Sequence, residues 1–177
     1  KLPLWIATGG HVESTVKIAQ AGLPIVYAII GGNPRYFKKL IQAYREIGSE
    51  AGYASQELKV GAHSWGWIAE DGEQAVKDYF HSTKQVVDAI SKDRPHWQEL
   101  RYEQYLEQVG PNGAMFVGNP DQVAEKLIRM IEDLDLDRFM LHLPLGSMPH
   151  DQVLRAIELF GTQVAPKVRE YFAMKES

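Results

Sequence analysis

The stretch LWIATGGH, residues 4–11, joins a short apolar run to a pair of glycines and the start of a helical pattern. An apolar run of this length that ends in glycine is typical of a buried strand in a parallel sheet. The residues that follow place apolar side chains at helical spacing until Gly22 closes the segment. The stretch therefore predicts a strand over 4–8, a glycine turn and a helix over 11–21.

The same order of strand and helix recurs along the rest of the chain. Further strands are expected over 24–30, over 58–62 or as far as 67, and over 138–143. Helices are expected over 33–47, 73–90, 119–134 and 151–160, with a short helix inside the irregular segment 94–112 and a break or restart at Pro166. Four strands that alternate with helices, without a hairpin signal between them, predict an α/β fold with a parallel sheet covered by helices.

Two architectures fit this alternation: an open doubly wound sheet and half of an eight-fold βα barrel. A full barrel usually needs about 250 residues and rarely has fewer than about 200. The chain has 177 residues and contains no linker-like boundary. We therefore expect one domain over 1–177, built either as an open sheet or as half a barrel.

Composition excludes several classes of function. Apolar residues make up 45% of the chain and charged residues 24%, which are globular values. The formal net charge of −4 leaves no basic surplus for phosphate contacts, so nucleic acid is not expected as a partner. No apolar run approaches the length of a membrane span, and the absence of cysteine excludes disulfide and thiolate chemistry.

The first residues lack the features of a signal peptide, so we expect a cytoplasmic protein. They also lack a methionine and read as the interior of a buried strand. From these two features we expect the chain to be a piece of a longer protein or a processed one.

Ligands of parallel α/β proteins bind at the carboxyl ends of the strands, which directs attention to four loops. They are residues 8–14, 29–33, 63–67 and 142–148. In the first loop the two glycines allow close approach of the backbone to a ligand, and the N-terminus of the next helix offers amide donors to an anion.

Side chains near the first loop can add donors to a phosphate: His11 and Ser14 first, and Thr15 less so. The alternative interpretation is a plain glycine turn in which Ser14 caps the first helical turn. The loop is neither a P-loop, since no lysine follows the glycines at the required place, nor a dinucleotide fingerprint.

The other loops carry less chemistry. A plain turn with a helix cap explains the second loop. In the third, His63 and the nearby Trp65 and Trp67 can form a wall for a planar aromatic ligand, although tryptophans more often lie in a core. His142, between two leucines, is interpreted as a hydrogen-bonded core residue. Neither a zinc-helix spacing of histidines nor the G-x-S-x-G motif of serine hydrolases is present.

Five segments in register resemble the second half of the bacterial-luciferase-like flavin monooxygenases. The segments are residues 4–14 continuing to 22–25, 63–66, 116–124, 137–143, and 156–161 continuing through 164–166. Together they span nearly the whole chain in the order that the family shows.

This resemblance implies a (βα)8 TIM barrel of which the chain covers about four C-terminal βα units, strands five to eight. It implies a cofactor, which is reduced FMN used with O₂ or, in a sister branch of the family, a deazaflavin. The site residues that it implies are Gly9, Gly10, His11 and Ser14 around the flavin phosphate, Ala28 and Ile29 near the flavin ring, and His63 and Trp65 along the substrate cavity. It assigns no catalytic residue, because those of the family lie in its first four strands.

Two functions are therefore carried forward. The first is a flavin-dependent oxidoreductase acting on a small organic substrate, with His63 as a proton donor or acceptor. The second is a non-catalytic βα scaffold that binds a partner or a flavin without turnover, and a sugar-phosphate enzyme is a third and weaker option. Because four βα units leave two open sheet edges, we expect a homo-oligomer unless further strands cover those edges.

Overall fold

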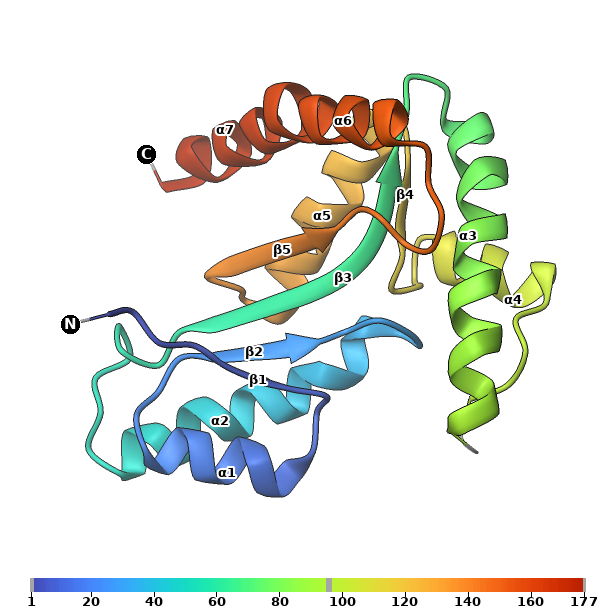
Figure 1. Cartoon of the computed structure of the whole chain (residues 1–177). Helices are drawn as coiled ribbons and strands as arrows, with labels where there is room; N and C mark the ends of the chain where they lie inside the picture. Colours follow the sequence, from blue (N-terminus) through green and yellow to red (C-terminus); the bar gives the residue numbers. More distant parts are fainter. Residues whose placement is uncertain (1, 95–96, 177) are drawn as a thin grey trace. The chain divides into compact units, whose positions relative to one another are not determined.

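The computed structural model in Figure 1 describes residues 2–94 and 97–176. Within these residues the strands are β1 (Ile6–Thr8), β2 (Ile25–Ala28), β3 (Val60–Ile68), β4 (Phe116–Gly118) and β5 (Arg138–His142). The α-helices are α1 (Val12–Gln20), α2 (Lys38–Glu50), α3 (Gly72–Asp93), α4 (Tyr102–Val109), α5 (Pro120–Leu134), α6 (His150–Leu159) and α7 (Ala165–Glu176). A 3-10 turn, Pro34–Phe37, precedes α2, and a π-helical turn, Phe160–Val164, joins α6 to α7.

Strand β3 is the centre of the sheet. Its first half pairs in parallel with β2, its last residues pair in parallel with β4, and β5 pairs with it as well. Strand β1 extends the sheet by pairing in parallel with β2. The parallel sheet and its alternating helices confirm the α/β fold predicted from the sequence.

The described residues form two compact units. The first is drawn from residues 1–64 and 129–140, and the second from residues 65–128 and 141–177. The expectation of a single domain over 1–177 stays a prediction.

In the first unit, Asp137 fixes the start of β5 beside the start of β3. Its backbone N–H donates to the carbonyl of Val60 at 2.8 Å, and its carboxylate accepts the N–H of Val60 at 2.8 Å. Arg45 of α2 pairs with Asp135 and lies within 3.8 Å of the Asp137 carboxylate. These contacts, made by the residue that precedes β5, fix the register in which β5 pairs with β3.

In the second unit, aromatic rings and one buried lysine form the core. The ring of Trp67 stacks on that of Tyr79 with 5.9 Å between the centroids. Lys126 is only 8% exposed, and its ammonium donates to the carbonyls of Val109, Gly110 and Met115 at 2.9, 2.7 and 2.6 Å. A single cation therefore satisfies the carbonyls at the end of α4 and in the following loop.

Three differences from the sequence predictions have simple causes. Strand β4 was not predicted, because three residues between a loop and a helix are too few to show a pattern. The first strand starts at Ile6, and Leu4 is 57% exposed, so the expectation that the chain starts inside a buried strand is wrong. At Pro166 the helix does not break: a π-helical turn, after which the Ala165 N–H donates to the Phe160 carbonyl, joins α6 directly to α7. The missing N–H of Pro166 falls where the hydrogen-bond pattern changes from π to α.

Replacing Lys126 by methionine should destabilise the protein by about 2–3 kcal/mol, because buried carbonyl groups lose a charged donor. Urea unfolding of Lys126→Met measures the loss. The matched control is Lys77→Met on the exposed face of α3, which should change the unfolding free energy by less than about 0.5 kcal/mol. Equal effects of the two variants would show that the Lys126 contacts do not stabilise the fold.

Candidate cofactor-phosphate site

The turn between β1 and α1 requires glycine at position 10. Gly10 has φ +95°, a backbone conformation that residues with a side chain rarely adopt. A Cβ atom on Gly10 would lie 2.8 Å from Cε1 of Phe37, whereas a Cβ on Gly9 would meet no atom within 4 Å. The chain therefore turns tightly at Gly10 while Gly9 leaves open space above the backbone.

Directly after this turn, α1 presents the amides of its first turn. His11 is the N-cap residue, with extended backbone, and its side chain makes no capping bond. The amides of Val12, Glu13 and Ser14 have no acceptor within the helix, because the first N–H groups of an α-helix precede its hydrogen-bonding pattern. With the exposed imidazole of His11 and the half-buried hydroxyl of Ser14, they form a set of donors suited to an anion.

Two buried hydroxyl groups, on the side of α1 that faces the sheet, support this turn. Thr15 is 1% exposed, and its hydroxyl donates to the carbonyl of His11 at 3.1 Å. Its oxygen lies 3.2 Å from the hydroxyl of Tyr27, so the Tyr27 hydroxyl is the donor in that pair. The ring of Tyr27 meets the ring of Phe37 edge to face at 5.6 Å. Thr15 therefore does not face a ligand, and its role is to hold the backbone of His11.

This support was not predicted from the sequence. Thr15 was considered only as a weaker phosphate donor, and Tyr27 only as part of an apolar strand. The available signal was the helical position of Thr15, one residue after Ser14, which turns its side chain toward the sheet.

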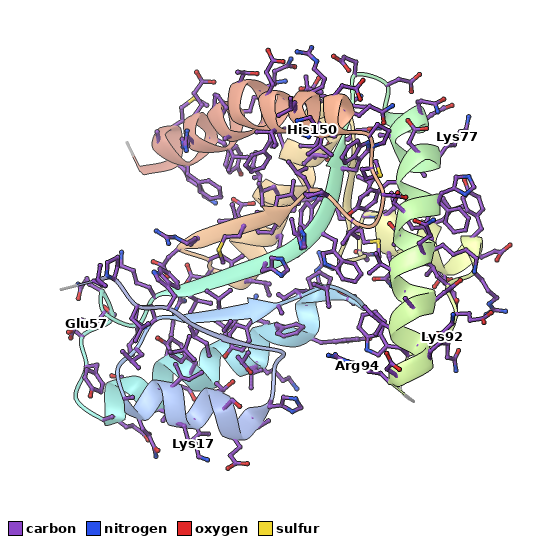
Figure 2. The ribbon with its side chains drawn as sticks, viewed as in Figure 1. Lys17, Glu57, Lys77, Lys92, Arg94 and His150 are labelled. Carbon is purple, nitrogen blue, oxygen red and sulfur yellow. The ribbon has the colours of Figure 1, made fainter. Side chains whose placement is uncertain are left out.

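The charge nearest the turn is balanced. Glu13 lies in the first turn of α1 and its carboxylate accepts a hydrogen bond from the ammonium of Lys17 at 2.7 Å. Both side chains are exposed, and Figure 2 shows the labelled Lys17 pointing away from α1 into solvent. Because Lys17 offsets the charge of Glu13, the amides of the first turn and the helix dipole set the local field.

Strand register places Ala28 next to the turn and His63 next to Ala28. Thr8 pairs with Tyr27, and the next residue of β2, Ala28, pairs with His63 of β3. Since the strands are parallel, Gly9 and Ala28 lie at the carboxyl ends of β1 and β2, whereas His63 lies in the middle of β3, opposite Ala28. Ala28 and His63 are half-buried, so both retain accessible surface.

Ile29 does not share this accessible surface. Its side chain is fully buried, its N–H donates to the His63 carbonyl at 2.8 Å, and its carbonyl accepts the Ser64 hydroxyl at 2.9 Å. Ile29 therefore holds β2 against β3, and its side chain lies in the core.

The structure also places Trp65 and His142, for which the sequence offered interpretations. Trp65 belongs to the second unit, is 6% exposed, and its ring lies 6.2 Å from that of Trp97. This is the core role that was the alternative for the tryptophans. His142 is exposed at the end of β5, so its interpretation as a core residue is wrong: alternate residues of β5 are exposed, and His142 falls on that face.

Two further findings concern the described residues 2–94 and 97–176. They contain no cluster of three histidine, aspartate or glutamate side chains that is arranged to hold a metal ion. None of their helices combines the length and the apolar character needed to cross a membrane.

The parallel sheet, its helices and the glycine turn after β1 define an α/β protein. The family model of the luciferase-like monooxygenases matches residues 1–137, which is more than half of the chain. The chain belongs to this family. The resemblance seen in the sequence is therefore confirmed.

Solved structures share the fold. The monooxygenase RslO1 of Streptomyces bottropensis is 20% identical with a TM-score of 0.74, over 92% of this chain and 47% of its own. The coenzyme F420 dependent tetrahydromethanopterin reductase of Methanopyrus kandleri is 18% identical with a TM-score of 0.62, over 93% of this chain and 50% of its own. The oxygenating constituent of 3,6-diketocamphane monooxygenase of Pseudomonas putida, solved with FMN, is 18% identical with a TM-score of 0.64, over 93% and 48%.

The chain thus spans about half the length of the structures that it matches. Of the two architectures that length left open, these matches favour half of a TIM barrel over an open sheet. No curated protein sequence matches the chain significantly.

Replacing Gly10 by alanine should destabilise the protein by about 1–2 kcal/mol, because alanine resists the positive φ and its Cβ meets Phe37. The same change at Gly9, where the space is open, should cost less than about 0.5 kcal/mol. Urea unfolding of the two variants compares them directly. A larger loss at Gly9 than at Gly10 would contradict the geometry described for this turn.

The Tyr27 hydroxyl should make stability depend on pH in the alkaline range. Burial raises the pKa of Tyr27 from 10.0 to about 12, against a smaller opposing effect of its hydrogen bond to Thr15. The folded state therefore keeps a proton that the unfolded state loses, so this contribution is present below pH 10 and is lost as the pH rises toward 12. Unfolding free energies measured across this range should fall less steeply for Tyr27→Phe than for the unchanged protein. Tyr36→Phe, at an exposed position, should leave the slope unchanged.

Proposed function

We propose that this chain carries the cofactor-phosphate site of a flavin-dependent oxidoreductase, with FMN as the cofactor and a small organic molecule as the substrate. The observation that carries the proposal is the turn at Gly10, which exposes the amide groups at the start of α1 at the carboxyl edge of the sheet. Membership of the luciferase-like monooxygenase family supports the same chemistry.

The donors at the turn fit a phosphate group. Gly9 and Gly10 would allow the phosphate to approach the backbone, the first-turn amides of α1 would bond with its oxygens, and His11 and Ser14 would add side-chain donors. The Gly10 amide itself already donates to the Thr8 hydroxyl at 3.3 Å. No lysine or arginine belongs to the turn itself, so backbone donors and the helix dipole would supply most of the attraction. When bound, the flavin would supply the redox chemistry, with O₂ as the oxidant of its reduced form.

Strands β2 and β3 offer two residues for the flavin ring and its surroundings. Ala28 is small and half-buried, which allows a planar ring to approach the backbone. His63, its neighbour in β3, would donate or accept a proton beside the ring. Ile29 would act behind these residues, since its side chain is buried in the core of the first unit. Trp65 is buried in the core of the second unit.

A deazaflavin is the alternative cofactor of the same site. One similar structure is of an F420-dependent reductase and another contains FMN, so the fold itself accommodates both classes. We choose FMN because the family is described by its monooxygenases. A cytoplasmic location and a homo-oligomer are part of the proposal, the latter because β1 ends the strand order of the described sheet and leaves an open edge.

The test compares two ligands that differ by one phosphate. FMN and riboflavin are titrated into the protein, and binding is followed by quenching of flavin fluorescence, with F420 in a parallel titration. We expect FMN to bind at least tenfold more tightly than riboflavin. Ser14→Ala combined with Gly10→Val should remove that difference, while Ser49→Ala, an exposed serine on α2, should retain it.

Equal affinities for FMN and riboflavin in the unchanged protein would overturn the phosphate assignment. Flavin binding without oxidation of the bound reduced flavin by O₂ would support the non-catalytic scaffold instead. Binding of F420 in preference to FMN would change the cofactor and keep the site.

A further inference from the structure

A polar cavity of about 290 Å³ lies in the second unit, between α3 and the residues that open α6. In Figure 2, the labelled Lys77 marks α3 and the labelled His150 marks the start of α6. The loop on one side of the cavity follows β5, which places the cavity near the carboxyl end of that strand, where ligands of parallel α/β proteins bind. The cavity shares no residue with the candidate phosphate site and is independent of the proposed function.

Ser82 is the first evidence that the cavity is a site. It lines the cavity, it is 6% exposed, and the described residues give its hydroxyl no hydrogen-bond partner. Among the described hydroxyl groups, that of Tyr79 is both without a partner and closed off from solvent, and that of Ser82 is not. The small accessible surface of Ser82 therefore includes its oxygen. By contrast, the hydroxyls of Thr83 and Ser91 on the same helix donate to the carbonyls of Tyr79 and Asp88. The Ser82 oxygen is therefore open to the cavity, where a hydroxyl group of a ligand can bond with it.

Amide groups provide further donors around Ser82. The hydroxyl of Ser147 donates to Oε1 of Gln85 at 3.1 Å, which leaves the amide nitrogen of Gln85 with its two hydrogens to offer. Gln152 lines the cavity in the first turn of α6, and the N-cap residue of that helix, Pro149, has no capping bond. The backbone amides of this turn also precede the hydrogen bonds of the helix.

Acceptors line the same space. One oxygen of the Asp78 carboxylate accepts the amide of Gln74 at 2.7 Å, and the other is left for a donor in the cavity. Asp78 and Gln152 also line a neighbouring cavity of about 210 Å³.

Charge then selects the class of ligand. Neither lysine nor arginine lines the larger cavity; its ionisable lining residues are His81 and Asp78, and the Asp78 carboxylate would repel an anion. The positive end of α6 opposes a cation. Two apolar residues among eight are too few for an apolar ligand. Paired donors and acceptors without net attraction for charge suit hydroxyl groups, each of which donates one hydrogen bond and accepts two.

We propose that this cavity binds a neutral polyhydroxylated small molecule, a polyol or a sugar. Gly146 preserves the space: it has φ +56°, and a Cβ on it would lie 3.1 Å from the Ser82 carbonyl oxygen and 3.3 Å from Oε1 of Gln85. A side chain at this position would push the loop away from α3.

The test is a titration followed by NMR on the ¹⁵N-labelled chain. Ribitol and myo-inositol are the polyhydroxylated probes, and inorganic phosphate and tetramethylammonium are the charged controls. Either polyhydroxylated probe should cause saturable shifts of the side-chain amide signals of Gln85 and Gln152. Ser82→Ala should weaken binding about fivefold, and Ser91→Ala, whose hydroxyl is engaged within α3, should change it less than twofold.

A second variant tests the same cavity in case Ser82→Ala disturbs the fold. Gln85→Leu replaces an exposed side chain and should weaken binding to a similar degree. The absence of saturable shifts with both polyols would overturn the proposal, as would equal shifts with phosphate or tetramethylammonium. Unchanged binding in both Ser82→Ala and Gln85→Leu would also overturn it.

Discussion

The hydroxyl groups of Thr15 and Tyr27, 3.2 Å apart, connect the first helix to the sheet beneath it. Because the Thr15 hydroxyl also holds the carbonyl of His11, this buried contact fixes where α1 begins. The ring of Tyr27 holds Phe37, and Phe37 occupies the space that a side chain at Gly10 would need. The exposed amides that make the turn a candidate phosphate site therefore depend on a support that lies entirely inside the first unit.

The regular part of the fold follows from its pattern. Apolar runs that end in glycine predicted β1 and β2, and Asn33 and Pro34 marked the turn before α2, where the Asn33 side chain accepts the N–H of Arg35. The spacing of apolar residues and the positions of glycine and proline are local features of the sequence, so these elements can be predicted without the three-dimensional structure.

Long-range contacts account for what the sequence did not predict. Strand β4 exists because Phe116 and Val117 pair with the last residues of β3, some fifty positions earlier. Whether His142 faces solvent or core depends on which face of β5 is covered, and flanking leucines do not determine that. Similarly, Ile29 and Ala28 are adjacent in sequence, yet only Ala28 keeps accessible surface at the edge of the sheet. The residue types of the candidate site were thus predictable, and their accessibility was not.

Family membership and local geometry support the same conclusion about the turn at Gly10 by separate routes. The family model matches residues 1–137, and the turn offers donors suited to a phosphate without reference to any relative. The polar cavity beside Ser82 is a different case, because it rests on an unpaired hydroxyl and on the charge of its lining alone.

A crystal structure of the chain grown with FMN tests the central claim most directly. The account predicts the phosphate within hydrogen-bonding distance of the amides in the first turn of α1. A phosphate bound elsewhere, with that turn contacting only solvent, would contradict it.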